Sequence, residues 1–190
     1  MIGIARTRGL VHQPLTIAII GAGSAGRDFA IACAAAGFNV ILEDVMPDKL
    51  RNAAVEFARI GREVTLVSTV EDAVREADIV FDFVPDELES KLEIWSMIDR
   101  MAPPKTIMCT PSQVLSITDL ASCTYRGDRC IMVRGPLGGN GSIRLLSAAN
   151  TSAATVALAT TIFTTLGYEA VPQADPDLPQ LLKNMHATHI

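Results

Sequence analysis

The chain has 190 residues, with 16 Lys or Arg against 21 Asp or Glu, so its formal net charge is −5 at pH 7. This length suits one ordinary globular domain. Nucleic acid is not an expected partner, because its recognition calls for clusters of basic residues that neutralise phosphates. Apolar stretches such as Phe29 to Gly37 and Ala153 to Leu166 are too short, or too rich in Thr and Gly, to span a bilayer. No membrane association is therefore expected.

The chain ends and the cysteines point to a cytoplasmic location. The first fourteen residues carry Arg6 and Arg8 but lack an apolar segment with a small-residue cleavage site, so they do not read as a secretory signal. The cysteines form no C-x-x-C pair and have no histidine at metal spacing, so neither a metal site nor a disulfide framework is expected. We interpret all four as reduced thiols, mostly buried: Cys33, Cys109, Cys123 and Cys130.

Hydrophobic periodicity divides the chain into alternating strands and helices. Short β-branched runs alternate with longer stretches of 3.6-residue period, which predicts an α/β fold: a doubly wound, Rossmann-type, mostly parallel sheet with helices on both faces. We expect six parallel strands, with one or two more at the edge. The predicted strands are Leu15–Ile20, Asn39–Glu43, Val64–Val67, Ile79–Val84, Thr106–Cys109, Cys130–Val133, Leu145–Ala149 and Glu169–Val171.

Several predicted helices have readable ends. A hydroxyl followed three residues later by an acid resembles a capping box, and a glycine after an apolar stretch marks a helix C-terminus. These signals predict a helix over Asp48–Ile60 beside Pro47, caps at Thr69 and Ser116, and a helix over Ala153–Leu166 capped by Thr151 or Ser152.

Three segments follow from this pattern. The folded domain is expected over residues 15–174, preceded by a loose lead-in over residues 1–14. Residues 175–190 are expected to form a weakly packed tail.

A glycine-rich turn directly follows the first predicted strand. Gly21-Ala-Gly23-Ser-Ala-Gly26 has the G-x-G-x-x-G pattern, and a predicted helix begins within it. In such a turn Gly21 permits the tight bend, Gly23 lets the backbone approach a pyrophosphate, and Gly26 lets the helix pack close to the strand. The free amides around Ser24 and Ala25 then bind the anion.

An acidic residue follows the second predicted strand at the spacing typical of dinucleotide-binding proteins. Asp44 lies 23 residues after Gly21 and can accept hydrogen bonds from the adenosine ribose hydroxyls. A 2′-phosphate there would be repelled by Asp44 and by Glu43 beside it. The sequence therefore predicts NAD as the cofactor, in preference to NADP.

Together with the glycine-rich turn, two further segments resemble those of a known family. With Val84-Pro85-Asp86-Glu87 and Leu115-Ser-Ile-Thr-Asp-Leu-Ala121, the chain resembles the NAD-binding domain of the 3-hydroxyacyl-CoA dehydrogenase family from about Leu15 to Pro172. The resemblance implies a domain that binds NAD(H) and, in the family, oxidises a 3-hydroxyacyl thioester. It also implies cofactor positions at the three glycines and Asp44, and at Pro85, Asp86 and Lys91. Asp86 replaces the family's glutamate near the nicotinamide ribose.

The catalytic positions that the resemblance implies hold different residues. The family's active-site serine corresponds to Gln113, with Ser112 one position away, and its acid/base histidine corresponds to Arg134. The family's asparagine corresponds to Leu137, and the glutamate that orients the histidine corresponds to Ser147 or Leu146. Since a guanidinium stays protonated, Arg134 cannot serve as the base.

Two classes of function stay open at this point. One is an oxidoreductase acting on a hydroxyl or keto group of a small molecule, either an acyl-CoA or, with Arg134 clamping it, a small anion. Arg134 and Ser112 are then the candidate catalytic residues. The other is a non-catalytic NAD(H)-binding module. The glycine-rich loop 135–141 fits either a lid or a loop without a role, and a homodimer through Leu145–Leu166 or a partner chain could cover the site.

Overall fold

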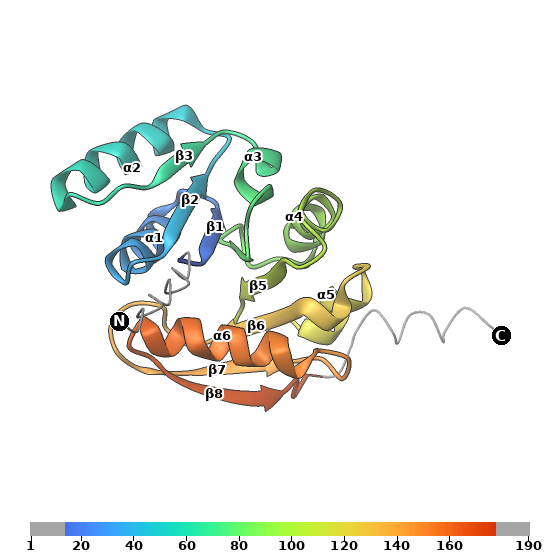
Figure 1. Ribbon diagram of the computed structural model, residues 1–190. Coiled ribbons are helices and arrows are strands. Elements are labelled where there is room, and N and C mark those ends of the chain that lie inside the picture. Colours follow the sequence, from blue (N-terminus) through green and yellow to red (C-terminus); the bar gives the residue numbers. More distant parts are fainter. Residues whose placement is uncertain (1–13, 178–190) are drawn as a thin grey trace, which may run out of the picture.

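The computed structural model describes residues 14–177 and has the predicted α/β class (Figure 1). Apart from Pro14, the predicted lead-in lies outside the described residues, as does the predicted tail beyond Asp177. Within residues 14–177, no helix is long and apolar enough to cross a membrane.

One eight-stranded sheet forms the centre, in the order β3-β2-β1-β4-β5-β6-β7-β8. The six strands from β3 to β6 in that order are parallel, whereas β7 is antiparallel to β6 and parallel to β8. This confirms the predicted parallel core with two edge strands. The strands are β1 Thr16–Ile20, β2 Asn39–Glu43, β3 Thr65–Val67, β4 Ile79–Asp82, β5 Ile107–Pro111, β6 Cys130–Arg134, β7 Ser142–Ser147 and β8 Glu169–Ala174.

Helices cover both faces of the sheet and create two apolar cores. Apolar side chains of α1, α2 and α6 pack on one face, and those of α3, α4 and α5 pack on the other (Figure 1). On the first face Phe29, Phe81 and Phe163 form a cluster with ring centroids 4.7–6.1 Å apart. The helices are α1 Ser24–Ala35, α2 Pro47–Ile60, α3 Val70–Val74, α4 Leu88–Met101, α5 Ile117–Ser122, the 3₁₀ turn η1 Gly127–Arg129 and α6 Ala153–Thr165.

The predicted helix ends are confirmed where a cap was named. Thr69 and Ser116 each accept a hydrogen bond from the amide three residues on, and Ser152 does so for α6. Gly61 ends α2 with φ 62°, a left-handed conformation that glycine adopts without a steric cost.

Five predicted strand boundaries are wrong by two or three residues: the end of β4, the end of β5, both ends of β7 and the end of β8. The predicted fourth strand reached Val84, but β4 ends at Asp82 because the chain turns there toward Pro85. Strand β7 begins at Ser142, where it pairs with β8, and β8 continues through Pro172 to Ala174. An edge strand tolerates proline, since one side of its ladder needs no donor.

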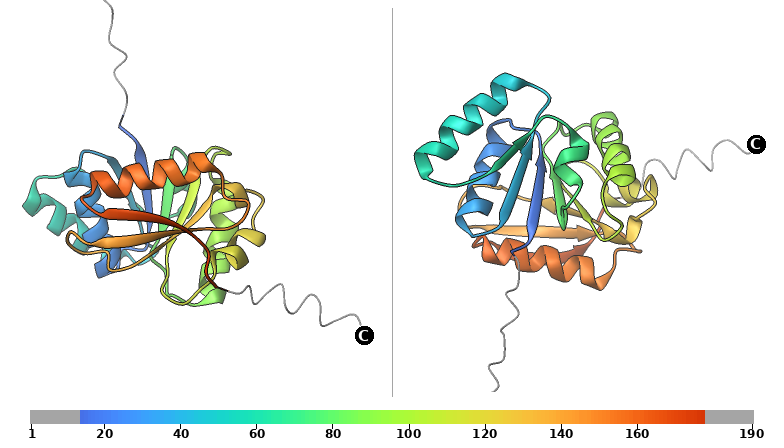
Figure 2. Two further views of the ribbon diagram at one scale, coloured as in Figure 1. Left: turned by 90° about the horizontal axis from the view of Figure 1, so that it is seen from below. Right: turned by 45° about the horizontal axis from the view of Figure 1, so that its top comes forward.

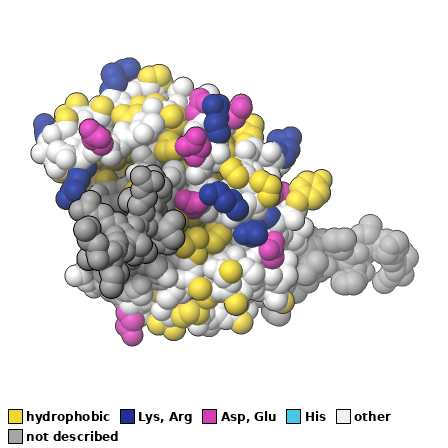
Figure 3. All heavy atoms as spheres, in the orientation of Figure 1, with side chains coloured by type: hydrophobic (Ala, Val, Ile, Leu, Met, Phe, Trp, Pro, Cys, Tyr) yellow, Lys and Arg dark blue, Asp and Glu magenta, His cyan; other side chains and the backbone are white. Residues whose placement is uncertain are grey.

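The sheet twists strongly toward its antiparallel edge. Figure 2 shows β7 and β8 crossing steeply over the direction of β1 and β2, with α6 lying along them. Helix α6 contains no charged residue, and Figure 3 shows mostly hydrophobic and uncharged surface in its region. Elsewhere on the same view basic and acidic side chains are mixed, without a basic patch.

Candidate cofactor site

The glycine-rich turn has the backbone geometry that its sequence predicted. Gly21 has φ +102°, and a Cβ atom there would lie 3.0 Å from the carbonyl oxygen of Phe83. At Gly26 a Cβ atom would come within 1.9 Å of the Gly21 carbonyl oxygen, so a side chain cannot be accommodated without moving the turn. These two glycines therefore let β1, the turn and α1 pack together.

The N-terminus of α1 is built to receive an anion. Gly23 is the N-cap and has no side chain that could accept a hydrogen bond from the first amides of the helix. These are the amides of Ser24, Ala25 and Gly26. The first turn has no acidic residue, and no atom lies within 4 Å of a Cβ placed on Gly23. Exposed amides and the positive end of the helix dipole together favour a phosphate at this point.

Asp44 lies directly beside this turn. Its carboxylate accepts hydrogen bonds from the Ala22 amide at 2.9 Å, from the Met46 amide at 2.9 Å and from Lys49 Nζ at 3.1 Å. Burial alone would raise the pKa of Asp44, but these three bonds hold it below its ordinary value. The side chain is thus an ionised acceptor fixed between the glycine turn and α2.

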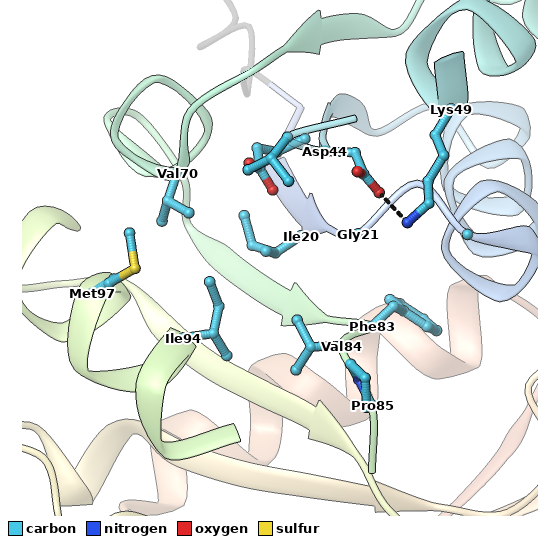
Figure 4. A pocket seen from close by; sticks show the side chains of 13 residues that line it. Ile20, Gly21, Asp44, Lys49, Val70, Phe83, Val84, Pro85, Ile94 and Met97 are labelled. Atoms are coloured by element: carbon cyan, nitrogen blue, oxygen red, sulfur yellow. Dashed lines mark hydrogen bonds and ion pairs between the residues drawn. The ribbon is translucent and has the colours of Figure 1, made fainter. Parts of the chain in front are cut away.

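A pocket of about 300 Å³ extends from the turn across the carboxyl ends of β1, β2 and β4. Figure 4 shows its far wall, where Val70 of α3 and Ile94 and Met97 of α4 point toward Ile20. Asp44 and Lys49 lie at the opposite end, joined by their ion pair. An apolar slot with a few polar groups at one end suits a base attached to a ribose.

A second group of predicted residues surrounds the loop after β5. Asp86 is exposed, and its carboxylate accepts a hydrogen bond from the Gln113 amide at 2.9 Å. Lys91 is buried, donates to the Pro111 carbonyl at 3.1 Å and pairs with Asp82 at 2.5 Å. Both side chains thus hydrogen-bond to the backbone at the end of β5 and in the loop after it. Asp86 does so at the surface and Lys91 from the protein interior.

Trp95 completes the buried pair. Its indole Nε1 donates to the other oxygen of Asp82 at 2.7 Å. The Asp82 carboxylate therefore has a partner on each oxygen, and the charge of Lys91 is neutralised where both side chains are only 1 % exposed. Unpaired charges at such a depth would be strongly destabilising.

The two candidate catalytic residues lie together, and both are occupied by structural contacts. The Ser112 hydroxyl accepts hydrogen bonds from the amides of Val114 and Leu115. Arg134 is 7 % exposed; its guanidinium donates to the Ser112 and Leu115 carbonyls and pairs with Asp177 at 2.8 Å. The structure thus places Arg134 beneath the loop after β5.

Two charged residues next to the glycine turn were not predicted from the sequence. Lys49 pairs with Asp44, and Arg27 donates to the Ala22 carbonyl while pairing with Glu56 at 3.0 Å. Lys49 is five residues after Asp44, in the first turn of α2, and this spacing is a signal that the sequence could have offered. The pairing of Arg27 with Glu56 depends on how α1 and α2 pack, which the sequence does not state.

Cys109 lies in β5 and is an unreactive thiol in this structure. It is 1 % exposed, and burial raises its pKa well above the ordinary value. A thiol that stays protonated is a poor nucleophile and a poor redox group.

Comparison with known proteins gives one consistent family. The profile described as "3-hydroxyacyl-CoA dehydrogenase, NAD binding domain" matches residues 16–65 and 54–175. A probable 3-hydroxybutyryl-CoA dehydrogenase of Bacillus subtilis is 29% identical over 133 residues, covering 60% of this chain and 46% of that protein. An L-carnitine dehydrogenase of Burkholderia mallei is 30% identical over 131 residues, covering 62% and 41%.

Solved structures agree with this assignment. A 3-hydroxyacyl-CoA dehydrogenase from Archaeoglobus fulgidus superposes with a TM-score of 0.76 and 25% identity, covering 91% of this chain and 60% of that one. The chain belongs to the family of 3-hydroxyacyl-CoA dehydrogenase NAD-binding domains. Its cofactor is NAD, and the turn, Asp44 and the pocket fit that molecule. The chain spans less than half the length of the curated relatives named above.

Proposed function

We propose that the chain is the NAD(H)-binding part of an oxidoreductase acting on a hydroxyl or keto group of a small molecule. The observation that carries this proposal is the open N-terminus of α1 beside the fixed carboxylate of Asp44. The amides at Gly23, Ser24, Ala25 and Gly26 would hold the pyrophosphate. Asp44 would accept hydrogen bonds from the adenosine ribose.

The nicotinamide half would lie over the ends of β4, β5 and β6. Pro85 and Asp86 would contact the nicotinamide ribose, while Lys91 would keep the adjoining loop in place from below. Bound NAD supplies a hydride acceptor for the carbinol carbon of the substrate. The hydroxyl proton must then pass to a base, which this chain or a partner has to provide.

A second candidate function is a non-catalytic NAD(H)-binding module. It is favoured by the contacts of Ser112 and Arg134, because one hydroxyl already serves two amides and the guanidinium stays protonated. General acid–base assistance is worth roughly 10²–10⁴-fold in rate, so its loss would leave little of the family's reaction.

The substrate and the partners belong to the proposal as well. The relatives' names favour an acyl-CoA, whereas Arg134 would favour a small anion if its guanidinium turned from Asp177 toward the cleft. The uncharged surface of α6 supports a homodimer or a partner chain at that edge. Four free cysteines support a cytoplasmic location. Residues 15–174 are proposed as the cofactor-binding domain.

A single spectroscopic assay distinguishes the oxidoreductase from the non-catalytic module. Purified protein is mixed with NADH and acetoacetyl-CoA while nicotinamide absorbance and fluorescence are recorded together. Turnover supports the oxidoreductase, binding without turnover supports the module or another substrate, and no binding contradicts both. In a parallel titration, an R134A protein that folds normally yet binds small carboxylates and NADH as the wild type does would exclude the anion clamp.

A further inference from the structure

A buried carboxyl group lies unpaired inside the pocket. Glu43 is 3 % exposed, it lines the pocket, and its Oε1 has no hydrogen-bond partner within residues 14–177. Thr110 also carries such an oxygen, but it does not line this pocket. A buried acceptor without a donor is costly for a protein to keep, which points to a donor that arrives with the ligand.

The sheet register fixes the side of the pocket on which Glu43 lies. Glu43 pairs with Ile20 of β1 and Val67 of β3, so its side chain shares their face of the sheet. That is the face covered by α3 and α4. Asp44, the next residue, is held at the glycine turn instead. The carboxylate of Asp44 therefore lies at the glycine turn, whereas that of Glu43 lies on the side of the pocket formed by α3 and α4.

We infer that Glu43 reads the base of the cofactor by accepting a hydrogen bond from the exocyclic amino group of adenine. With the ribose at Asp44, the attached base enters the slot between Ile20, Ile94 and Met97, where Glu43 supplies the unpaired oxygen. The amino group is the strongest donor on adenine's edge. A 6-oxo base would instead set an oxygen against the carboxylate. This inference rests on the placement of NAD proposed above.

The test compares bases that differ only at position 6. Binding of AMP, IMP and purine riboside monophosphate, which carries hydrogen at that position, is measured by calorimetry at pH 8. NAD and its hypoxanthine analogue are compared in the same way. A lost hydrogen bond to a charged group predicts at least about tenfold weaker binding of both variant bases.

Two variants sharpen the result. E43Q keeps the shape of the side chain but offers both a donor and an acceptor, so the preference for AMP over IMP should fall to about threefold or less. E63Q changes an exposed glutamate in the loop between α2 and β3, outside the pocket, so it is the matched control and should retain the wild-type preference. Thermal melting checks that both variants fold.

The outcomes distinguish this inference from the proposed function. Equal affinity of the wild-type protein for AMP and both variant bases would overturn the role of Glu43 while leaving NAD binding intact. An unchanged preference in a folded E43Q protein would overturn it as well. Failure of the wild-type protein to bind NAD or AMP at all would contradict the proposed function itself.

Discussion

Two glycines of the cofactor turn, Gly23 and Gly26, should respond differently to the same added methyl group. G26A forces a Cβ against the Gly21 carbonyl at 1.9 Å, so we expect a loss of several kcal/mol or failure to fold. In G23A the new methyl meets no atom within 4 Å, so the fold should persist while the pyrophosphate is blocked. Urea unfolding and NADH titration measure the two effects.

G138A serves as the control for both variants, since Gly138 has open space around it and lies outside the turn. We expect it to change stability by less than about 1 kcal/mol. An NADH affinity of G23A within twofold of the wild-type value would contradict the assignment of this turn to the pyrophosphate.

The titration of Glu43 should also make the stability of the protein depend on pH. Burial, followed by the charge of Asp44, raises its pKa from 4.5 to about 7, against the opposing charge of Lys49. The folded protein therefore holds a proton that the unfolded chain has released, and stability falls as pH rises from about 4.5 to about 7. The shift corresponds to a difference on the order of 3 kcal/mol.

E43Q removes this titration. Unfolding free energies of wild type and E43Q, measured between pH 4.5 and 8, should diverge in favour of E43Q until about pH 7 and then stay parallel. Parallel curves over the whole range would show that Glu43 titrates normally.

The sequence predicted the site residues whose roles depend on local backbone geometry. It did not predict those whose roles depend on how the helices pack on the sheet. Gly21, Gly26 and Asp44 follow from spacing, because a β-turn-α unit repeats the same short-range geometry wherever it occurs. Glu43 was read only as a second acid beside Asp44. Its separate role depends on which face of β2 is covered by α3 and α4, and no short-range pattern encodes that.

At the scale of elements, the segment after β8 is tied to the start of α5. Asp175 accepts hydrogen bonds from the Ser116 hydroxyl at 2.7 Å, the Thr118 amide at 2.9 Å and the Thr118 hydroxyl at 2.8 Å. Burial would raise the pKa of Asp175, but these donors keep it below its ordinary value. One carboxylate thus joins the edge of the sheet to the loop beside the cofactor site.

D175A should cost about 1–3 kcal/mol of unfolding free energy near pH 7, because it leaves these donors without their charged acceptor. The cost should shrink progressively as pH falls below about 4, the ordinary pKa of an aspartate, and it is lost once pH has passed through the lowered pKa of folded Asp175. Denaturant unfolding at pH 7 and pH 3 measures both values.

E169A removes an exposed carboxylate at the start of β8; it is the matched control and should change stability by less than about 0.5 kcal/mol. Losses of similar size in the two variants would contradict a specific role for Asp175.

The elements themselves were largely predictable, since buried parallel strands give continuous apolar runs and the helix caps are local. The largest boundary errors lie at β7 and β8. There residues 142–144 are strand because they pair with residues 169–171, and residues 172–174 are strand because they pair with residues 145–147. Such pairing is a property of two distant segments, and neither has a strong strand pattern alone.

At the scale of the whole molecule, NADH should stabilise the fold as a unit. A ligand at 100 times its Kd adds about 2.7 kcal/mol to the folded state. For a chain of this size, that raises Tm by roughly 5–11 °C, since each kcal/mol shifts Tm by about 2–4 °C. Differential scanning fluorimetry with NADH measures the shift.

NADPH is the matched control ligand, because its 2′-phosphate would face the carboxylates of Asp44 and Glu43. We expect a shift smaller by several degrees at the same concentration. An equal shift with NADPH would contradict the discrimination attributed to Asp44.

The hydrogen bonds from Ser116 and Thr118 to Asp175 join residues that are 59 and 57 positions apart in the chain. During synthesis, the glycine turn, α1 and all six parallel strands leave the ribosome before residue 175 exists. Closing so long a loop is also an entropically expensive step in refolding. The adenosine side of the cleft can therefore form early, whereas the nicotinamide side becomes rigid only when the last strand has docked.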